Sequence, residues 1–396
     1  MPSGFHRLIA AQFFSALADN ALLIVTMALL QQRGAPAWWA PLLKFGFTLS
    51  YVLLAPVVGP LSDAFPKARL MAWMNGVKVL GVLALLAGAN PIAAFVVVGF
   101  GAAAYAPAKY GLVTELVTPQ QLVAANGWLE VTVVCAVLLG TVAGGVLVSP
   151  AMAGLAASGV SALHLLLAVY ALAAWLNIGI PDSGARYARR SIHPIALLRD
   201  FRAGNATLWG DALGGLSLAA TTLFWGAGAT LQFVVLRWAQ EHLGLPLHQS
   251  SYLQAAVAVG VVAGAALAGR FVALADARRM LAFGVALGLM LPLVASTRSL
   301  WLAVPLLLLA GAVGGLMVVP LNALLQHRGC LLLTAGRSIA VQGFNENASI
   351  LAMLAVYAGL VALELPIVPL MWGFGLLLAL AIAVLMRRAR VAPAAV

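Results

Sequence analysis

The chain has very few charged residues and only two cysteines, and both shortages limit what it can be. Only 8% of its 396 residues are Asp, Glu, Lys or Arg, whereas 63% are hydrophobic, and the mean hydropathy is +1.03. A globular enzyme needs more polar surface than this, so the composition excludes the soluble classes and predicts an integral membrane protein. Cys135 is expected inside a span and Cys330 in a connection, which excludes a disulfide or shared metal site.

Motifs for several kinds of chemistry are also missing. The sequence contains no Walker A motif, so transport powered by ATP is not expected. None of its six histidines stands in a motif with serine or cysteine neighbours, which disfavours an intramembrane enzyme such as a lipid acyltransferase. The histidines also lack the spacing of metal ligands. We therefore expect no catalytic residues, no metal and no cofactor.

Long apolar runs dominate what is present. Each is about 20 residues long, enough to cross a hydrocarbon core as a helix, and none shows the ten-residue alternation of a transmembrane barrel. The sequence predicts an all-α polytopic membrane protein with twelve transmembrane helices, at about 8–31, 40–60, 70–89, 91–114, 121–148, 158–180, 213–240, 250–272, 279–297, 300–325, 337–362 and 365–386.

The net charge of +11 follows from the distribution of basic residues between these spans. With a cytoplasmic amino terminus, nearly all basic residues of the connections fall on the cytoplasmic side, and only Arg33 and Arg298 lie on the other. The positive-inside rule therefore places both termini in the cytoplasm. The basic residues form no continuous domain, which disfavours nucleic-acid binding.

Three pairs of positions repeat at nearly the same offset and indicate duplicated halves. Gln342 follows Asn126 by 216 residues, Pro320 follows Pro107 by 213, and Gly269 follows Gly59 by 210. The repeat predicts a six-helix amino-terminal half at 1–180 and a six-helix carboxy-terminal half at 211–396. The Pro-, Gly- and Arg-rich stretch 181–210 reads as a cytoplasmic linker, with a short amphipathic helix expected at 193–202. Two parallel six-helix repeats are the architecture of the major facilitator superfamily.

A few charged residues lie inside the apolar runs. A carboxylate near the bilayer centre costs at least about 2.5 to 3.5 kcal/mol, so it normally faces a bundle interior or a watery cavity. Glu130 and Glu346 stand in repeated segments, ANGWLE and VQGFNE, and Asp19 lies about 18 Å into the first span. The candidate cavity network consists of Asp19, Asn20, Lys78, Lys109, Asn126, Glu130, Gln232, Arg237, Gln342 and Glu346. Which of these charges pair, and whether Lys109 faces the cavity or the interface, stays open.

The segment GPLSDAFPKAR at 59–69 resembles the signature loop between the second and third helices of the facilitator superfamily. Gly59 permits close helix approach. Asp63 lies near a helix end, where it can cap a helix or pair with a basic group. We expect Gly59, Asp63, Lys67 and Arg69 to form a gating loop, and the alternative is a solvated turn.

Several segments together resemble the bacterial lysophospholipid transporters of this superfamily. They are ADNALL at 18–23, AAYAPAKYG at 103–111, LVAANG at 122–127, LFWGAG at 223–228, VPLNALLQ at 319–326 and VQGFNEN at 341–347. The resemblance implies alternating access in the inner membrane, with lysophosphatidylethanolamine and lysophosphatidylglycerol flipped inward. It also implies a separate cytoplasmic acyltransferase that re-acylates the product.

One position departs from that resemblance. Gln232 stands where comparable proteins carry an arginine, and Arg237 lies five positions later, about 140° around a helix. Helix seven therefore contributes to headgroup binding in some other way. The rival function from the residues alone is a proton-coupled efflux transporter of hydrophobic compounds, in which Asp19, Glu130 or Glu346 titrates.

Overall fold

The computed structural model describes residues 3–35, 39–149, 152, 161–188, 193–245 and 247–391, and within them it contains only helices and connections. Arg189 and Arg190 of the predicted linker lie outside the described residues. The long helices are α1 (Ser3–Gln32), α2 (Trp39–Ala64), α3 (Lys67–Leu86), α4 (Pro91–Leu116), α5 (Leu122–Leu147), α7 (Ala162–Ile178), α8 (Pro194–Gly210), α9 (Ala212–Glu241), α10 (Leu247–Phe271), α11 (Leu281–Ser296), α12 (Leu300–Leu332), α13 (Ala335–Ala362) and α14 (Ile367–Val391).

Eleven of these helices are long and apolar enough to cross a membrane. The shorter apolar helix α7 takes the place of the predicted span 158–180, of which residues 158–160 lie outside the described part. The chain is thus an all-helical, multi-span membrane protein. Helices suit this setting because each satisfies its own backbone hydrogen bonds where no water is available.

Polar residues mark where several helices begin. The side chain of Asn90 accepts hydrogen bonds from the backbone N–H groups of Ile92 and Ala93, at 2.9 and 3.2 Å, and Pro91 follows at the first helical position of α4. Asp211 accepts in the same way from the Gly214 N–H at 2.7 Å and caps α9. Each cap satisfies amide groups that the first helical turn leaves without a partner.

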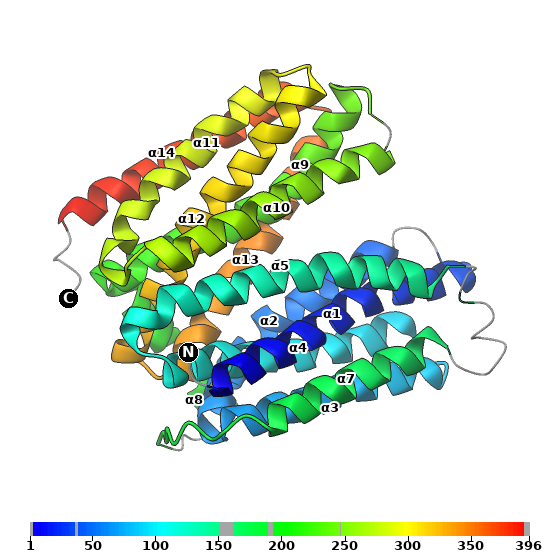
Figure 1. Ribbon diagram of the computed structural model, residues 1–396, viewed down its shortest axis with the longest axis vertical. Helices are drawn as coiled ribbons and strands as arrows, with labels where there is room; N and C mark the ends of the chain where they lie inside the picture. The colour runs from blue at the N-terminus through cyan, green and yellow to red at the C-terminus, as the bar shows by residue number, and fades with distance from the viewer. Residues whose placement is uncertain are drawn as a thin grey trace. The chain divides into compact units, whose positions relative to one another are not determined.

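The chain forms two compact units. The first comprises Met1–Thr118, Cys135–Gly204 and Leu333–Phe344. Within it α3 packs on α4 and α7, α1 packs on α7, and α2 packs on α4, and α3 and α7 lie side by side in Figure 1. Its core includes Leu22, Val82, Phe95 and Tyr170.

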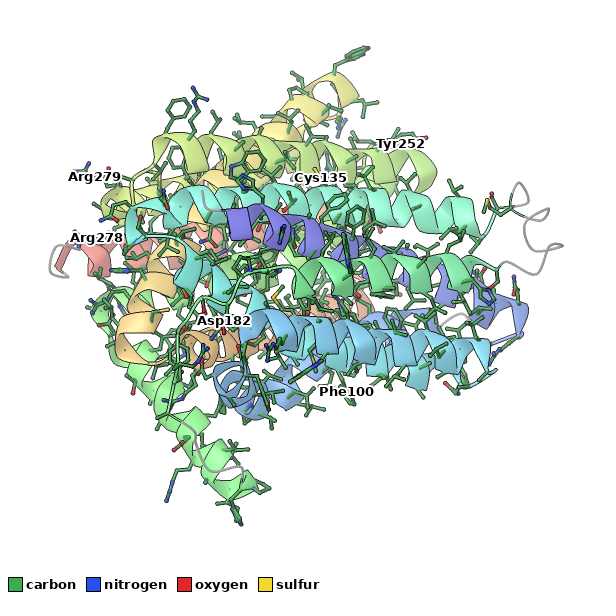
Figure 2. The ribbon with its side chains drawn as sticks, turned by 60° about the horizontal axis from the view of Figure 1, so that its bottom comes forward. Phe100, Cys135, Asp182, Tyr252, Arg278 and Arg279 are labelled. Atoms are coloured by element: carbon green, nitrogen blue, oxygen red, sulfur yellow. The ribbon has the colours of Figure 1, made fainter. Side chains whose placement is uncertain are left out.

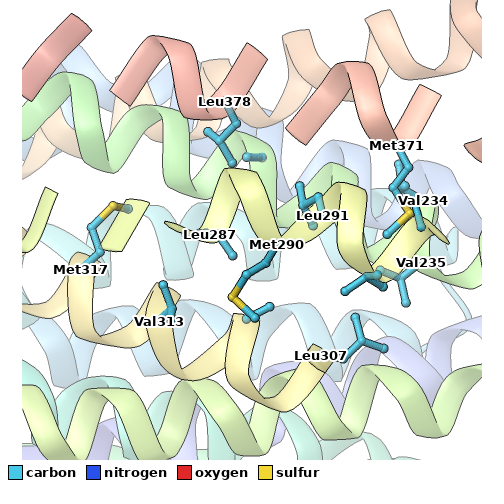
Figure 3. Packing of buried hydrophobic residues seen from close by; sticks show 14 of the residues in the cluster. Val234, Val235, Leu287, Met290, Leu291, Leu307, Val313, Met317, Met371 and Leu378 are labelled. Carbon is cyan, nitrogen blue, oxygen red and sulfur yellow. The ribbon is translucent and has the colours of Figure 1, made fainter. Parts of the chain in front are cut away.

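The second unit comprises Pro119–Val134, Asn205–Leu332 and Asn345–Val396. Here α10 packs along α12, and α11 packs along α14, a pairing that is clear in Figure 1. Figure 3 shows its core, where leucine, valine and methionine side chains of α9, α11, α12 and α14 meet. Because each unit takes a short segment from the other half of the sequence, the boundaries 1–180, 181–210 and 211–396 stay a prediction.

Three local expectations need correction. The segment 59–69 is not a loop: α2 continues to Ala64 and α3 begins at Lys67, which leaves only Phe65 and Pro66 as the connection. Cys330 lies within α12 rather than in a connection, because that helix continues to Leu332. The linker helix α8 is longer than expected, since it continues to Gly210.

Candidate functional site

The first unit buries an ion pair between α1 and α3. Lys78 Nζ lies 2.7 Å from Asp19 Oδ2, and the two side chains are 2% and 14% exposed. The ammonium also donates to Ser15 Oγ at 2.9 Å, and the Tyr170 hydroxyl donates to Asp19 Oδ1 at 2.8 Å. The pair is therefore held by hydrogen bonds from two further helix positions, as a buried charge pair requires.

The positions of these residues along their helices explain why they meet. Ser15 and Asp19 are four residues apart in α1, which places them on one helix face. Ser15 donates in turn to Asn75 Oδ1 at 2.7 Å, and Asn75 is three residues from Lys78 on α3. The Lys78 ammonium also lies 5.1 Å from the ring centroid of Tyr105. The result is a polar group inside an otherwise apolar bundle.

A second polar contact lies in the other unit, between α5 and α12. Asn126 Nδ2 donates to Gln326 Oε1 at 2.8 Å, and Gln326 Nε2 donates to Asn126 Oδ1 at 2.9 Å. Both side chains are almost fully buried, at 3% and 1% exposed. Beside them Gly127 lets α5 approach α10, because a Cβ there would lie 2.8 Å from the Ala265 carbonyl oxygen. Two carboxamides that satisfy each other in this way fix the register of the two helices.

The two repeated glutamates are both in the second unit. Glu130 on α5 is buried, with 6% exposed, and Glu346 on α13 is half-buried. Gln342, one turn before Glu346 on the same helix, is 7% exposed and belongs to the first unit. Asp19 likewise belongs to the first unit, so the three carboxylates do not share one unit.

The remaining predicted cavity residues lie in separate places. Asn20 donates to the carbonyl of Ala16 in its own helix at 2.8 Å. Lys109 on α4 is half-buried and lies 4.2 Å from the ring centroid of Tyr110. Arg237 lies near the end of α9, where it pairs with Glu241 at 2.5 Å and donates to the Leu365 carbonyl. Gln232 is exposed and lines an apolar cavity of the second unit.

The residues of the predicted gating loop contact the start of α13. Asp63 Oδ1 accepts from the Gly336 N–H at 2.9 Å, and Asp63 Oδ2 accepts from the Thr334 hydroxyl. A Cβ at Gly59 would lie 3.0 Å from the Arg337 Cα, so glycine allows α2 and α13 to approach closely. A carboxylate is favourable at the amino-terminal end of a helix because of its unsatisfied N–H groups and its dipole.

Lys67 joins this carboxylate to a second one. Its Nζ lies 2.6 Å from Glu115 Oε1 on α4 and 3.6 Å from Asp63 Oδ1. Glu115 also accepts from Ser183 Oγ at 2.6 Å and from the Tyr187 hydroxyl at 2.9 Å. The segment 183–187 that follows α7 is thereby tied to the ends of α3 and α4.

The other charged contacts of this region are more exposed. Arg186 donates to both carboxylate oxygens of Asp182, at 3.2 and 2.8 Å, and these bonds lower the pKa of that carboxyl below its ordinary value. Figure 2 shows Asp182 on the extended segment after α7. Arg69 is exposed and adds a smaller electrostatic contribution in the same direction.

Asp211, which caps α9, forms an ion pair with α12. Arg328 donates to both of its carboxylate oxygens, at 3.1 and 2.5 Å. The hydrogen bonds from Arg328 are the main reason that the pKa of Asp211 lies below its ordinary value of 3.8.

Several residues at these sites were not found by reading the sequence: Ser15, Asn75, Tyr170, Glu115, Asp211, Gln326 and Arg328. Two signals were available. Ser15 precedes Asp19 by one helical turn, and Asn75 precedes Lys78 by three residues. For Gln326 and Glu115 no such signal exists, because their partners are distant in the sequence. Within the described residues, no group of three or more His, Cys, Asp or Glu side chains could hold a metal ion.

The sequence profile of the Major Facilitator Superfamily matches residues 8–329. A protein of Shigella flexneri named lysophospholipid transporter LplT is 43% identical over 384 residues, which is 96% of this chain and 95% of that protein. A protein of the same name from Yersinia pestis (strain Pestoides F) is 44% identical over 361 residues, covering 91% of this chain and 87% of its own length.

Solved structures with the same fold are more distant in sequence. The fucose:proton symporter FucP of E. coli has a TM-score of 0.74 at 16% identity and covers 98% of both chains. A bacterial homologue of the iron transporter ferroportin, in an outward-facing state, has a TM-score of 0.70 at 17% identity and covers 97% of this chain and 99% of its own. At such identities the likeness shows the fold alone.

Proposed function

The chain belongs to the Major Facilitator Superfamily, and we propose that it moves lysophospholipids inward across the bacterial inner membrane. The observation that carries the proposal is identity of 43 to 44% with proteins named lysophospholipid transporter, over more than nine tenths of this chain. Both termini are cytoplasmic in this proposal, and a separate cytoplasmic-side acyltransferase re-acylates the product.

The ion pair of Asp19 and Lys78 is the proposed headgroup site. A lysophospholipid headgroup carries a phosphate, and a buried ammonium is a suitable partner for it. Lys78 is too deeply buried to reach the membrane surface, and Asp19 compensates its charge while no substrate is bound. When a phosphate contacts Lys78, Asp19 becomes available to an ethanolamine ammonium. Glycerol headgroups lack that ammonium and bind through the phosphate contact alone.

Alternating access needs contacts that form in one end state and break in the other. The contact of Asp63 with the start of α13 is the proposed gate, with Gly59, Lys67 and Arg69 at its sides. Asp63 accepts from a backbone N–H and a hydroxyl there, so movement of α13 relative to α2 breaks both bonds together. The other predicted cavity residues, from Asn20 to Glu346, are proposed to line the path of the headgroup.

A leaflet-resolved assay in proteoliposomes tests the proposal. Labelled lysophosphatidylethanolamine is placed in the outer leaflet, and its arrival in the inner leaflet is measured with and without the protein. We expect protein-dependent movement that Asp19→Asn abolishes. The matched control is Asp276→Asn, since Asp276 is an exposed carboxylate that pairs only with Arg279 three residues away among the printed contacts of the connection before α11.

Two outcomes contradict the proposal. The absence of any protein-dependent movement eliminates lysophospholipid as the substrate. Movement that occurs only against an imposed proton gradient favours the rival efflux transporter, whereas movement that is indifferent to the gradient counts against that rival. Lysophosphatidylglycerol, run in parallel, tests whether the ethanolamine group is required.

A further inference from the structure

The second unit contains an apolar cavity with an empty volume of about 780 Å³, lined by α9, α10, α11, α12 and α14. We propose that this cavity receives the acyl chain of a single-chain lipid and sets an upper limit on its length. The inference rests on the proposed function, because it takes the lysophospholipid as substrate. It adds the site that the tail occupies and the residue that limits the tail.

The lining matches an acyl chain in chemistry. None of the lining residues is charged, and leucines from four helices contribute, among them Leu231, Leu287, Leu307 and Leu378. Figure 3 shows Leu287, Leu291, Leu307 and Leu378 around this region. Gln232 and Gln254 supply the only side-chain amides, and the Gln254 side chain donates to the Gln232 carbonyl at 2.6 Å. A charged or strongly polar ligand would lose its hydration here without gaining partners.

The two amides lie toward one end of the cavity. Gln232 is in the last third of α9, and Gln254 is in the first third of α10, so both lie toward the connection between these helices. The rest of the lining is apolar. A ligand with one polar end and one long apolar end suits this arrangement, with its headgroup outside the cavity near the amides and its tail inside.

The length of the cavity matches one acyl chain. Along α9 the lining extends from Phe224 to Val235, which is 11 residues, and along α12 from Leu307 to Met317, which is 10 residues. At a rise of 1.5 Å per residue these stretches are about 16 and 15 Å long. A bilayer's hydrocarbon core is about 30 Å thick and contains two layers of chains, so one chain spans about 15 Å.

Gly228 controls how much of this space is open. A Cβ built there meets no atom within 4 Å, whereas a Cβ at Gly311, also in the lining, would lie 2.1 Å from the Val257 carbonyl oxygen. Gly311 is therefore needed for helix packing, but Gly228 is not. A larger side chain at 228 enters open space without pushing helices apart.

Fit, rather than hydrophobicity, must determine which chains are accepted. A tail that moves from lipid into an apolar cavity gains little, because lipid tails are as apolar as leucine. A tail that overfills the cavity, in contrast, meets the same penalty as an overpacked core. Chains shorter than the limit should pass at similar rates, and longer ones should be rejected.

The test is transport of lysophosphatidylethanolamines that differ only in acyl length, from lauroyl to oleoyl, by wild type and Gly228→Leu in proteoliposomes. We expect the variant to transport the lauroyl lipid within about twofold of wild type and to lose tenfold or more on the oleoyl lipid, in line with the penalty of overpacking. Gly373→Leu is the matched control, since Gly373 is an exposed glycine of α14 that also has no atom near a built Cβ and does not line the cavity.

The outcomes separate the inference from the function on which it rests. If wild type moves no lysolipid of any length, the proposed function fails. If wild type moves lysolipid and Gly228→Leu keeps the wild-type length profile, the function stands and the tail site is wrong. Should Gly228→Leu fail to fold, a lysolipid with a photoreactive group at its tail end is crosslinked to wild type. Adducts at Leu231, Leu307 or Leu378 support the site, and adducts only at exposed positions such as Trp301 overturn it.

Discussion

Lys78 Nζ lies 2.7 Å from Asp19 Oδ2, and the lysine side chain is only 2% exposed. Removal of one partner from such a pair leaves an uncompensated buried charge, at a cost of about 3 to 5 kcal/mol. We predict that Lys78→Met and Asp19→Asn each lower thermal stability in detergent, and that the double variant is more stable than Asp19→Asn alone.

Transport by the same double variant separates the structural role of the pair from its role in binding. We expect the double variant to remain inactive, since a phosphate then has no cation at this site. Thermal unfolding and lysolipid movement are measured on the same preparations. Wild-type transport by the double variant would show that the pair only stabilises the bundle.

The reciprocal carboxamide bonds of Asn126 and Gln326 allow a second prediction. Replacement of either residue by leucine leaves the other amide buried without its partner, which costs about 1 to 3 kcal/mol. The exchange of both residues, Asn126→Gln with Gln326→Asn, keeps the number of side-chain atoms across the contact. We expect it to restore most of the stability that either leucine variant loses.

A double-mutant cycle in thermal unfolding measures this coupling. The two leucine substitutions together should be less destabilising than the sum of the single effects. Strict additivity would mean that the two amides contribute independently and that their hydrogen bonds do not couple α5 to α12.

A third prediction concerns Glu115, which accepts from Ser183 and Tyr187 and pairs with the buried Lys67. Glu115→Gln removes the nearest negative charge from Lys67, and we expect a loss of roughly 3 kcal/mol. Ser183→Ala combined with Tyr187→Phe should cost less, about 1 kcal/mol for each hydrogen bond. Both changes should speed proteolysis of the segment 181–188.

Arg186→Ala is the control for this experiment. Its ion pair with Asp182 is exposed, at 65% and 46% for the two side chains, and exposed pairs contribute about 1 kcal/mol or less. We expect its cleavage rate to stay near that of wild type. An equal rate for Glu115→Gln and wild type would show that Glu115 does not hold the segment.

The ion pair of Asp211 and Arg328 makes stability depend on pH. The folded-state pKa of Asp211 lies below its ordinary value of 3.8, chiefly because Arg328 donates to both carboxylate oxygens. A lowered folded pKa contributes stability that is fully present above the unfolded value and is lost as pH falls through the folded value. In thermal unfolding, the contribution should therefore be complete at pH 5 to 7, about one unit or more above the ordinary value, and disappear below it.

Asp211→Asn tests this dependence. The variant should be less stable than wild type at neutral pH, by about 1 to 3 kcal/mol for hydrogen bonds to a charged group. The difference between the two proteins should narrow as pH falls below 3.8. A constant difference over the whole range would assign the acid sensitivity to other carboxylates.

The sequence by itself determined the class of protein and the number and order of its membrane helices. Apolar runs of about 20 residues can satisfy their backbone groups in lipid only as helices, so the runs predict their own structure. The exposed Trp301 and Leu377 illustrate the same rule, since lipid-facing and buried positions are equally apolar. The few charges inside the spans were also visible, because each is costly there.

Only the tertiary structure decided which of those residues meet. Lys78 rather than Lys109 or Arg237 pairs with Asp19, and Asn126 meets Gln326, 200 residues away. The spacing within one helix defines a face but not the neighbour of that face, since apolar helices offer many equivalent packings in sequence. Likewise the open space at Gly228 and the tight contact at Gly311 depend on neighbouring helices, which is why two similar glycines have different roles.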